Sequence, residues 1–171
     1  FIEIFANSSI AFTSTPAQGC DNVNVQFTNT TNCPSSNWDW NFGDGSVNSS
    51  DENPSHTYNT PGTYDVIFSA LVDGVVLSDT CVACVTVDVT PSVDYTTTGT
   101  IATCNLPISA SFAGNSNNPN VTYSWNFGDG TGSSNMQNPS YTYNDGGTFP
   151  VSLTVTSPEG CSNTIVKDTV F

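Results

Sequence analysis

The sequence predicts an all-β protein built from two tandem β-sandwich domains, and three observations predict it. One block of motifs occurs twice, at a constant shift of 85 residues. Apolar and polar residues alternate in short runs, which is typical of half-buried strands. Turn-forming residues separate these runs every 8 to 15 residues, and no stretch with helical periodicity exceeds one turn. A chain of 171 residues has room for two small domains.

The internal repeat is the strongest of these signals. Three segments recur in the same order at the same shift, and each keeps most of its letters. They are Trp40–Gly45 and Trp125–Gly130 (both WNFGDG), Asn53–Tyr58 and Asn138–Tyr143 (NPSHTY and NPSYTY), and Gly62–Tyr64 and Gly147–Phe149 (GTY and GTF).

Within each repeat the strands follow from period-two alternation. Val23–Phe27, Tyr64–Leu71 and Val151–Val155 each place apolar residues at every second position. Gly and Pro mark the turns between them, as at Pro61-Gly62 and Asp73-Gly74. Short strands at this spacing favour a β-sandwich of the immunoglobulin type in each repeat.

The repeat also sets the domain boundaries. We expect residues 7–89 to form repeat one and residues 90–171 to form repeat two, whose last strand is cut at the end of the chain. Residues 1–6 carry the sequence FIEIF, which aligns with the last strand of repeat one, so we expect them to be the tail strand of a preceding repeat. Pro91 should stiffen the linker and hold the two domains end to end with limited swing.

Charge and composition exclude several functions. The net charge is −14 with a single Lys or Arg, so we expect no binding of nucleic acid or of an anionic membrane surface. No apolar run approaches the ~20 residues that a membrane span needs, so we expect no membrane insertion. One His and one Lys leave almost nothing from which to build a catalytic triad, and we therefore expect no enzyme activity and no catalytic residue.

Six cysteines indicate disulfides and an oxidising compartment. Repeat two contains Cys104 and Cys161, so parity favours that pair. Cys81 and Cys84 lie three apart on one strand and should face opposite sides, so we expect each to take a different partner. These partners would be Cys20 and Cys33. A competing pairing joins the two repeats through Cys20 and Cys161, and both alternatives stay open.

The order WNFGDG, NPSHTY and GTY resembles the PKD-domain family, in tandem. That family has an immunoglobulin-like sandwich with a WDFGDG signature, an NPxHxY segment and a GTYxVxL strand. The resemblance covers about 80 residues of each repeat. The sequence departs from the pattern at Asn41 and Asn126, which replace Asp, and at Phe149, which replaces Tyr. The Thr- and Asn-rich style resembles long surface proteins of the Bacteroidota, which implies an exported, type IX-secreted surface protein, such as an adhesin or a gliding-motility component.

Most residues of the motif are expected to serve the fold. Large aromatic side chains on the third strand should anchor each core, and the glycines after them should form tight turns with positive φ. The aspartate in each turn should accept hydrogen bonds from its own backbone, and the late tyrosine should bond to a nearby backbone group. These structural-motif residues are Trp40, Phe42, Gly43, Asp44, Gly45 and Tyr58, and Trp125, Phe127, Gly128, Asp129, Gly130 and Tyr143. His56, which aligns with Tyr141, is expected to be an ordinary strand residue.

The alternative to a structural role is binding. The resemblance implies that some such domains bind Ca²⁺, so Asp44, Asp51 and Glu52 are weak calcium candidates, although repeat two has Met136 and Gln137 at the last two positions. We expect no other cofactor. Trp38 and its mate Tyr123 are the candidates for stacking on a glycan. Thr169 lies in an Asp-Thr-Val sequence that resembles a Bacteroidota O-glycosylation pattern.

The sequence therefore favours non-catalytic spacer repeats of a long extracellular protein, in which each repeat contacts its neighbours and the disulfides stiffen the rod. The alternative is an adhesin module that binds a polysaccharide or another extracellular surface and is stiffened by calcium.

Overall fold

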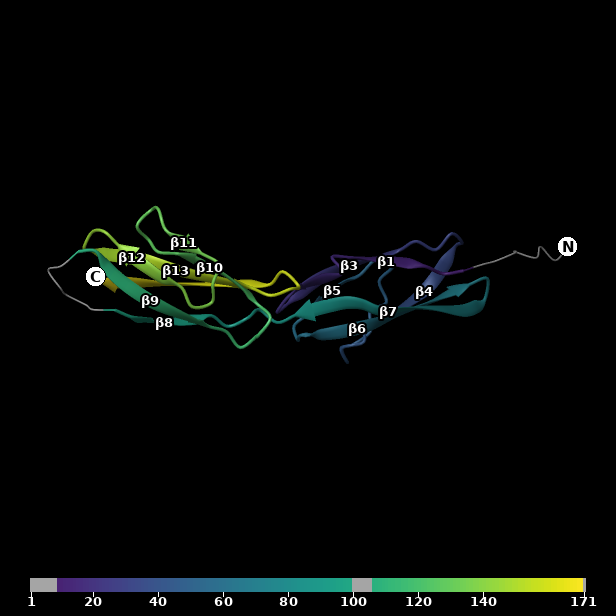
Figure 1. Cartoon of the computed structure of the whole chain (residues 1–171). Coiled ribbons are helices and arrows are strands. Elements are labelled where there is room, and N and C mark those ends of the chain that lie inside the picture. The colour runs from purple at the N-terminus through teal and green to yellow at the C-terminus, as the bar shows by residue number, and fades with distance from the viewer. Residues whose placement is uncertain (1–8, 100–105, 171) are drawn as a thin grey trace. The chain divides into compact units, whose positions relative to one another are not determined.

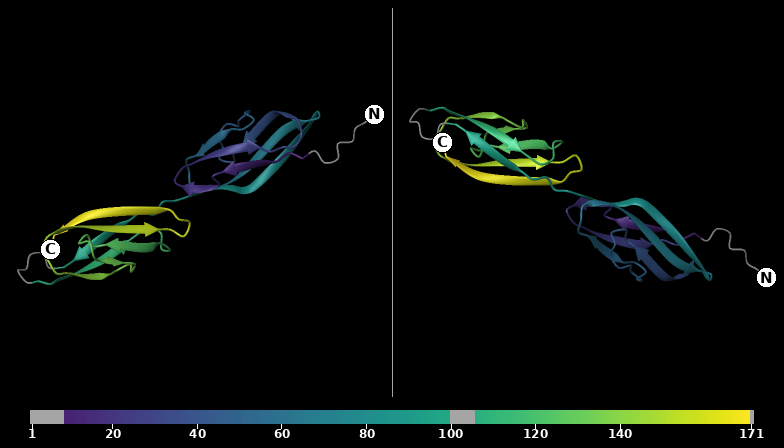
Figure 2. Two further views of the ribbon diagram at one scale, coloured as in Figure 1. Left: turned by 90° about the horizontal axis from the view of Figure 1, so that it is seen from above. Right: turned by 90° about the horizontal axis from the view of Figure 1, so that it is seen from below.

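The structure, a computed structural model, describes residues 9–99 and 106–170 (Figure 1). The chain divides into two compact units between Val89 and Thr90. Both units are all-β in their described residues, each with two stacked layers of strands (Figure 2). Among these residues no helix is long and apolar enough to cross a membrane. The tail strand that we expect at residues 1–6 lies outside the described part of the chain.

The first unit is a sandwich of a three-stranded and a four-stranded sheet. The three-stranded sheet has the order β1-β3-β5 and the four-stranded sheet the order β2-β7-β6-β4, in which only β2 and β7 are parallel. The strands are β1 (Phe12–Thr15), β2 (Gln18–Cys20), β3 (Val23–Asn29), β4 (Ser35–Asn41), β5 (Ser55–Tyr58), β6 (Gly62–Val72) and β7 (Val75–Asp88).

The second unit repeats this plan except at the edges of its four-stranded sheet. Its sheets have the orders β12-β9-β8 and β11-β10-β13-β14, and all their pairs are antiparallel. The strands are β8 (Asp94–Thr98), β9 (Ile108–Asn115), β10 (Thr122–Asn126), β11 (Ser133–Ser134), β12 (Ser140–Tyr143), β13 (Thr148–Thr156) and β14 (Ser162–Val170). The prediction of an all-β fold with two tandem sandwiches is confirmed.

An aromatic cluster fills each core. Trp40 and Trp125 are almost completely buried on β4 and β10. In the first unit the Trp40 ring stacks on Phe68 of β6 with centroids 4.1 Å apart, and in the second Tyr95 of β8 meets Trp125 edge-on. Because such large side chains remove much apolar surface from water, they explain why sandwiches this small can hold together.

One sheet face in the second unit shows the alternation clearly. β13 buries Val151, Leu153 and Val155 and leaves the residues between them half-buried. Lys167 of β14 ties this sheet to the other at one side of the sandwich, because its Nζ lies 2.5 Å from Asp94 Oδ1 and donates to Tyr95 O at 2.6 Å.

The last two strands of the first unit are less regular than the sequence predicts. Tyr64 of β6 pairs with Val85 and Val66 pairs with Cys81, so Asp65 alone faces the three residues 82–84 of β7. Ala83, in the middle of this bulge, has a φ of 53°. The left-handed residue turns the strand back, so that the Cα atoms of Cys81 and Cys84 lie only 5.3 Å apart.

The two cysteines of the bulge form a disulfide with each other, so the prediction that they take different partners is wrong. It assumed the strict alternation of a regular strand, which the bulge interrupts. Cys33 keeps its thiol, with Sγ 3.2 Å from Asn32 Oδ1, so its expected pairing with this strand is also wrong. Cys20 and Cys161 are both disulfide-bonded. Cys104 lies outside the described residues.

Candidate functional site

Both units contain the same turn, which follows β4 in the first unit and β10 in the second. In the first unit Gly43 has a φ of 78° and Gly45 a φ of 80°, values that favour glycine. A Cβ on Gly43 would lie 2.2 Å from the backbone oxygen of Asp65, whereas a Cβ on Gly45 would meet nothing within 4 Å. The first glycine is therefore needed both for its backbone conformation and for the close approach of the turn to β6.

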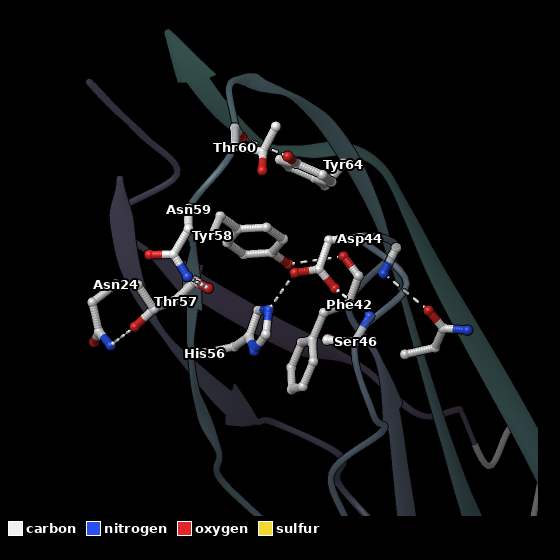
Figure 3. Close-up of polar contacts among 12 residues, drawn as sticks. Asn24, Phe42, Asp44, Ser46, His56, Thr57, Tyr58, Asn59, Thr60 and Tyr64 are labelled. Carbon is white, nitrogen blue, oxygen red and sulfur yellow. Dashed lines mark hydrogen bonds and ion pairs between the residues drawn. The ribbon is translucent and has the colours of Figure 1, made fainter. Parts of the chain in front are cut away.

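Asp44 connects this turn to β5. Its Oδ1 accepts the N–H of Ser46 at 3.0 Å, as expected for an aspartate in such a turn, and its Oδ2 lies 2.7 Å from Nε2 of His56 (Figure 3). Partial burial raises the pKa of Asp44, but the hydrogen bonds from Ser46 and His56 outweigh burial and hold that pKa below its usual value. The His56 ring stacks on Phe42 with centroids 4.1 Å apart.

Tyr58 connects the same turn to the core. Its hydroxyl donates to the backbone oxygen of Phe42 at 3.0 Å, and its ring packs against Tyr64, whose own hydroxyl donates to Thr60 O at 2.5 Å (Figure 3). Burial is the largest cause of a raised pKa at Tyr58, and the negative charge of Asp44 adds to it. Tyr58 thus stays a neutral donor over the ordinary pH range.

The second unit builds the same cluster with one exchange. Asp129 Oδ1 accepts the N–H groups of Thr131 and Gly132 at 3.0 and 2.9 Å, and Oδ2 accepts the hydroxyl of Tyr141 at 2.5 Å. The Tyr141 ring stacks on Phe127 with centroids 4.2 Å apart. The hydrogen bond from Tyr141, followed by those from the backbone, holds the pKa of Asp129 well below its usual value.

His56 and Tyr141 therefore occupy equivalent places, and sequence reasoning missed their bond to the aspartate. The signal was present, because both residues carry a planar ring with a hydrogen-bond donor at its tip. The late tyrosine is also equivalent in both units, since Tyr143 donates to Phe127 O at 2.9 Å.

The two core tryptophans hold the loop beyond the turn. Trp40 Nε1 donates to Asp51 O at 2.9 Å, and Trp125 Nε1 donates to Met136 O at 2.8 Å. Asp51 and Met136 are aligned positions, so the loop is attached through its backbone and tolerates different side chains there. This accounts for an acidic residue in one repeat and an apolar residue in the other.

The weak calcium candidates do not form a cluster. Asp44 points toward His56, while Asp51 and Glu52 are exposed. Over residues 9–99 and 106–170, no three His, Cys, Asp or Glu side chains are close enough together to hold a metal ion. Calcium favours six to eight oxygen ligands from several groups.

The glycan-stacking candidates differ from a flat exposed platform. Trp38 and Tyr123 are half-buried, and each packs against the hydrophobic core of its own unit. Trp38 Nε1 also donates to Ser35 Oγ at 3.2 Å. The glycosylation candidate Thr169 is half-buried on β14, with Oγ1 within 3.5 Å of Lys167 O.

In each unit, the hydrogen bonds of the turn aspartate and the late tyrosine connect the turn to the neighbouring strands. The carboxylates of Asp44 and Asp129 accept hydrogen bonds from within their own units, and the tyrosine hydroxyls donate to backbone oxygens. Such an arrangement stabilises the sandwich by satisfying polar groups at its end.

Comparisons with known proteins agree with this architecture. A family model described as "PKD domain" matches residues 8–82 and again residues 88–171. Among solved structures, fibronectin(III)-like modules of Clostridium thermocellum CbhA align over 94% of this chain and 93% of theirs, with 18% identity and a TM-score of 0.50. This likeness shows the fold.

A second solved structure, from work on carbohydrate-binding modules of the β-sandwich superfamily, aligns over 96% of this chain and 94% of that one. Its identity is 15% and its TM-score 0.41. The family match is to a PKD domain, and no enzyme family is indicated.

Proposed function

The chain belongs to the PKD-domain family, and from this premise we propose that its two repeats are non-catalytic spacer units of a longer extracellular surface protein or adhesin. The observation that carries the proposal is the use of the motif residues. In both units the turn aspartate and the late tyrosine form bonds within the sandwich, and the aspartate's partner changes from His56 to Tyr141 without loss of the bond. A residue kept for binding or catalysis would not be exchanged so freely.

The proposed extracellular location rests on the disulfide chemistry. The bond between Cys81 and Cys84, together with the bonded states of Cys20 and Cys161, fits an oxidising compartment. Export by the type IX route and an origin in the Bacteroidota remain proposals from the sequence resemblance.

The spacer is proposed to be stiff. We propose that disulfides contribute to this stiffness, since Cys20 and Cys161 are both disulfide-bonded. Pro91 restricts the linker further. The net charge of −14 would keep neighbouring rods apart in solution.

Backbone ¹⁵N relaxation of the whole 171-residue chain tests this proposal. A stiff spacer predicts that amides of both units fit one common anisotropic diffusion tensor. The variant Cys20→Ser/Cys161→Ser should loosen the linker and give each unit its own tensor, whereas the control Cys33→Ser, which removes no disulfide, should keep the common one. Two independent tensors in the native chain would refute the stiff spacer.

A second candidate function, binding of a neutral polysaccharide, is favoured by one face of the second unit. Toward one end of this sheet the outward residues of β10, β13 and β14 stand in register and carry mostly hydroxyl or amide groups, whereas the exposed Asp168 of β14 lies one row beyond them. The rows are Thr122–Thr156–Ser162, Ser124–Thr154–Thr164 and Asn126–Ser152, the last row ending at Val166.

Pull-down on chitin, cellulose and algal glycans tests this second candidate. Retention that Thr154→Asp abolishes, and that Ser109→Asp on the opposite sheet leaves intact, would support binding through this face. Absence of retention on all three would reject it. Calcium stiffening is tested separately by calorimetry, since a melting temperature that a chelator leaves unchanged would reject it.

A further inference from the structure

The bulge in β7 is the main difference between two otherwise equivalent strand pairs. In the second unit β13 and β14 pair one-to-one without interruption, from Thr148 with Val170 to Thr156 with Ser162. In the corresponding ladder of the first unit, β7 has two more residues than β6 at the position of Asp65. Asp65 Oδ1 caps the bulge by accepting the N–H of Ala83 at 2.7 Å.

The alternation of side chains along β7 is compatible with a second register. A slip of one residue would turn every side chain to the wrong face, but a slip of two residues keeps each on its own face. If the bulge were removed in this way, Ala83 would replace Val85 opposite Tyr64, and Val85 would replace Val87 opposite Gly62. The slip would also cost contacts, because Val85 is fully buried in the bulged register and Thr86–Asp88 pair with β2 there.

The disulfide excludes the slipped register. In a continuous strand the Cα atoms of residues three apart are separated by about 10 Å. A disulfide requires a separation below about 7 Å. The observed 5.3 Å between Cys81 and Cys84 is therefore compatible with the bulge and incompatible with a regular ladder.

The bond is also placed where a reductant can reach it. Cys81 and Cys84 are both half-exposed, and the Val82 side chain between them is 74% exposed. Cys84 Sγ lies 3.8 Å from Ser14 Oγ of β1, so a polar neighbour is ready for the thiol that reduction would create.

We propose that the Cys81–Cys84 disulfide is a reducible lock on the register of β7. A dithiol reductant transfers two electrons and two protons to the pair. One of its thiolates attacks a sulfur of the bond, its second thiol resolves the mixed disulfide, and the reductant leaves as a disulfide while two protein thiols remain. Freed of the bond, β7 slips by two residues into a continuous ladder like that of β13 and β14. The carboxyl end of the strand then moves by ~7 Å along β6.

NMR of the variant Cys81→Ala/Cys84→Ala in the full chain tests the lock. The native chain should show a cross-strand backbone NOE between Tyr64 and Val85. In the variant we expect that NOE to be lost and a new one between Tyr64 and Ala83 to appear, while the NOEs between β13 and β14 stay unchanged as an internal reference. The proposal would be overturned if the variant kept the Tyr64–Val85 NOE and showed no NOE between Tyr64 and Ala83.

Two further measurements separate the disulfide from the aspartate cap. Asp65→Ala with the disulfide intact should keep the Tyr64–Val85 NOE, and its loss there would show that the cap sets the register instead. If the double cysteine variant does not fold, the variant Cys20→Ser/Cys161→Ser treated with dithiothreitol gives the same readout, because dithiothreitol would otherwise also reduce the bonds of Cys20 and Cys161. An unchanged NOE after mass spectrometry has shown both cysteines reduced would also refute the lock.

Discussion

Replacing Gly43 with alanine should destabilise the first unit much more than the same change at Gly45. Both positions have φ near 80°, which costs an alanine about 1 kcal/mol. At Gly43 the new Cβ would also lie 2.2 Å from the backbone oxygen of Asp65, so the turn must move away from β6. Forcing extra atoms into a packed site costs about 1–3 kcal/mol. We therefore expect a total of about 2–4 kcal/mol for Gly43→Ala and about 1 kcal/mol for Gly45→Ala.

Thermal unfolding followed by NMR, with amides of the second unit as the internal reference, measures the difference. For a unit of this size, each kcal/mol lowers the melting temperature by about 4–8 °C. Gly43→Ala should thus lower the melting temperature of the first unit by at least about 8 °C, and the second unit should melt as before. Equal shifts for Gly43→Ala and Gly45→Ala would refute the argument, because they would leave the close approach to β6 without an energetic role.

Other substitutions test the remaining contacts. Because the folded-state pKa of Asp129 is lowered, its ionised carboxylate stabilises the fold above the unfolded-state pKa near 4, and this contribution is lost on acidification below that value. Asp129→Asn should therefore make the unfolding free energy depend less on pH between pH 5 and pH 2. Tyr58→Phe leaves a buried carbonyl without its donor and should cost about 1–3 kcal/mol in denaturant unfolding. His56→Tyr should stay within about 0.5 kcal/mol of the native chain, whereas a larger loss would contradict the equivalence of the two rings. Cys81→Ala/Cys84→Ala should cost about 2 kcal/mol, since the bond closes a loop of only four residues.

The repeat made most of the fold predictable from the sequence. The WNFGDG block places a tryptophan, a phenylalanine and a glycine turn at the same point of both units, and period-two alternation around it identifies strands such as β3 and β13. These features depend on local pattern, which a single sequence carries.

Features that depend on contacts between distant residues were harder to predict. The partners of Asp44 and Asp129 lie 12 residues farther along the chain on another strand. The only sign of them in the sequence was that His56 of one repeat aligns with Tyr141 of the other. The bulge at Ala83 was missed because a left-handed alanine leaves no mark in the sequence. The disulfide prediction failed for the same reason, since it rested on the alternation that the bulge interrupts.

Small-angle X-ray scattering of the 171-residue chain, with calcium and with chelator, tests the central claim most directly. The spacer account predicts an elongated particle whose largest dimension is the same in both conditions, because no calcium is required for stiffness. A compact particle, or one that bends or shortens when the chelator is added, would contradict it and would favour metal-dependent adhesion instead.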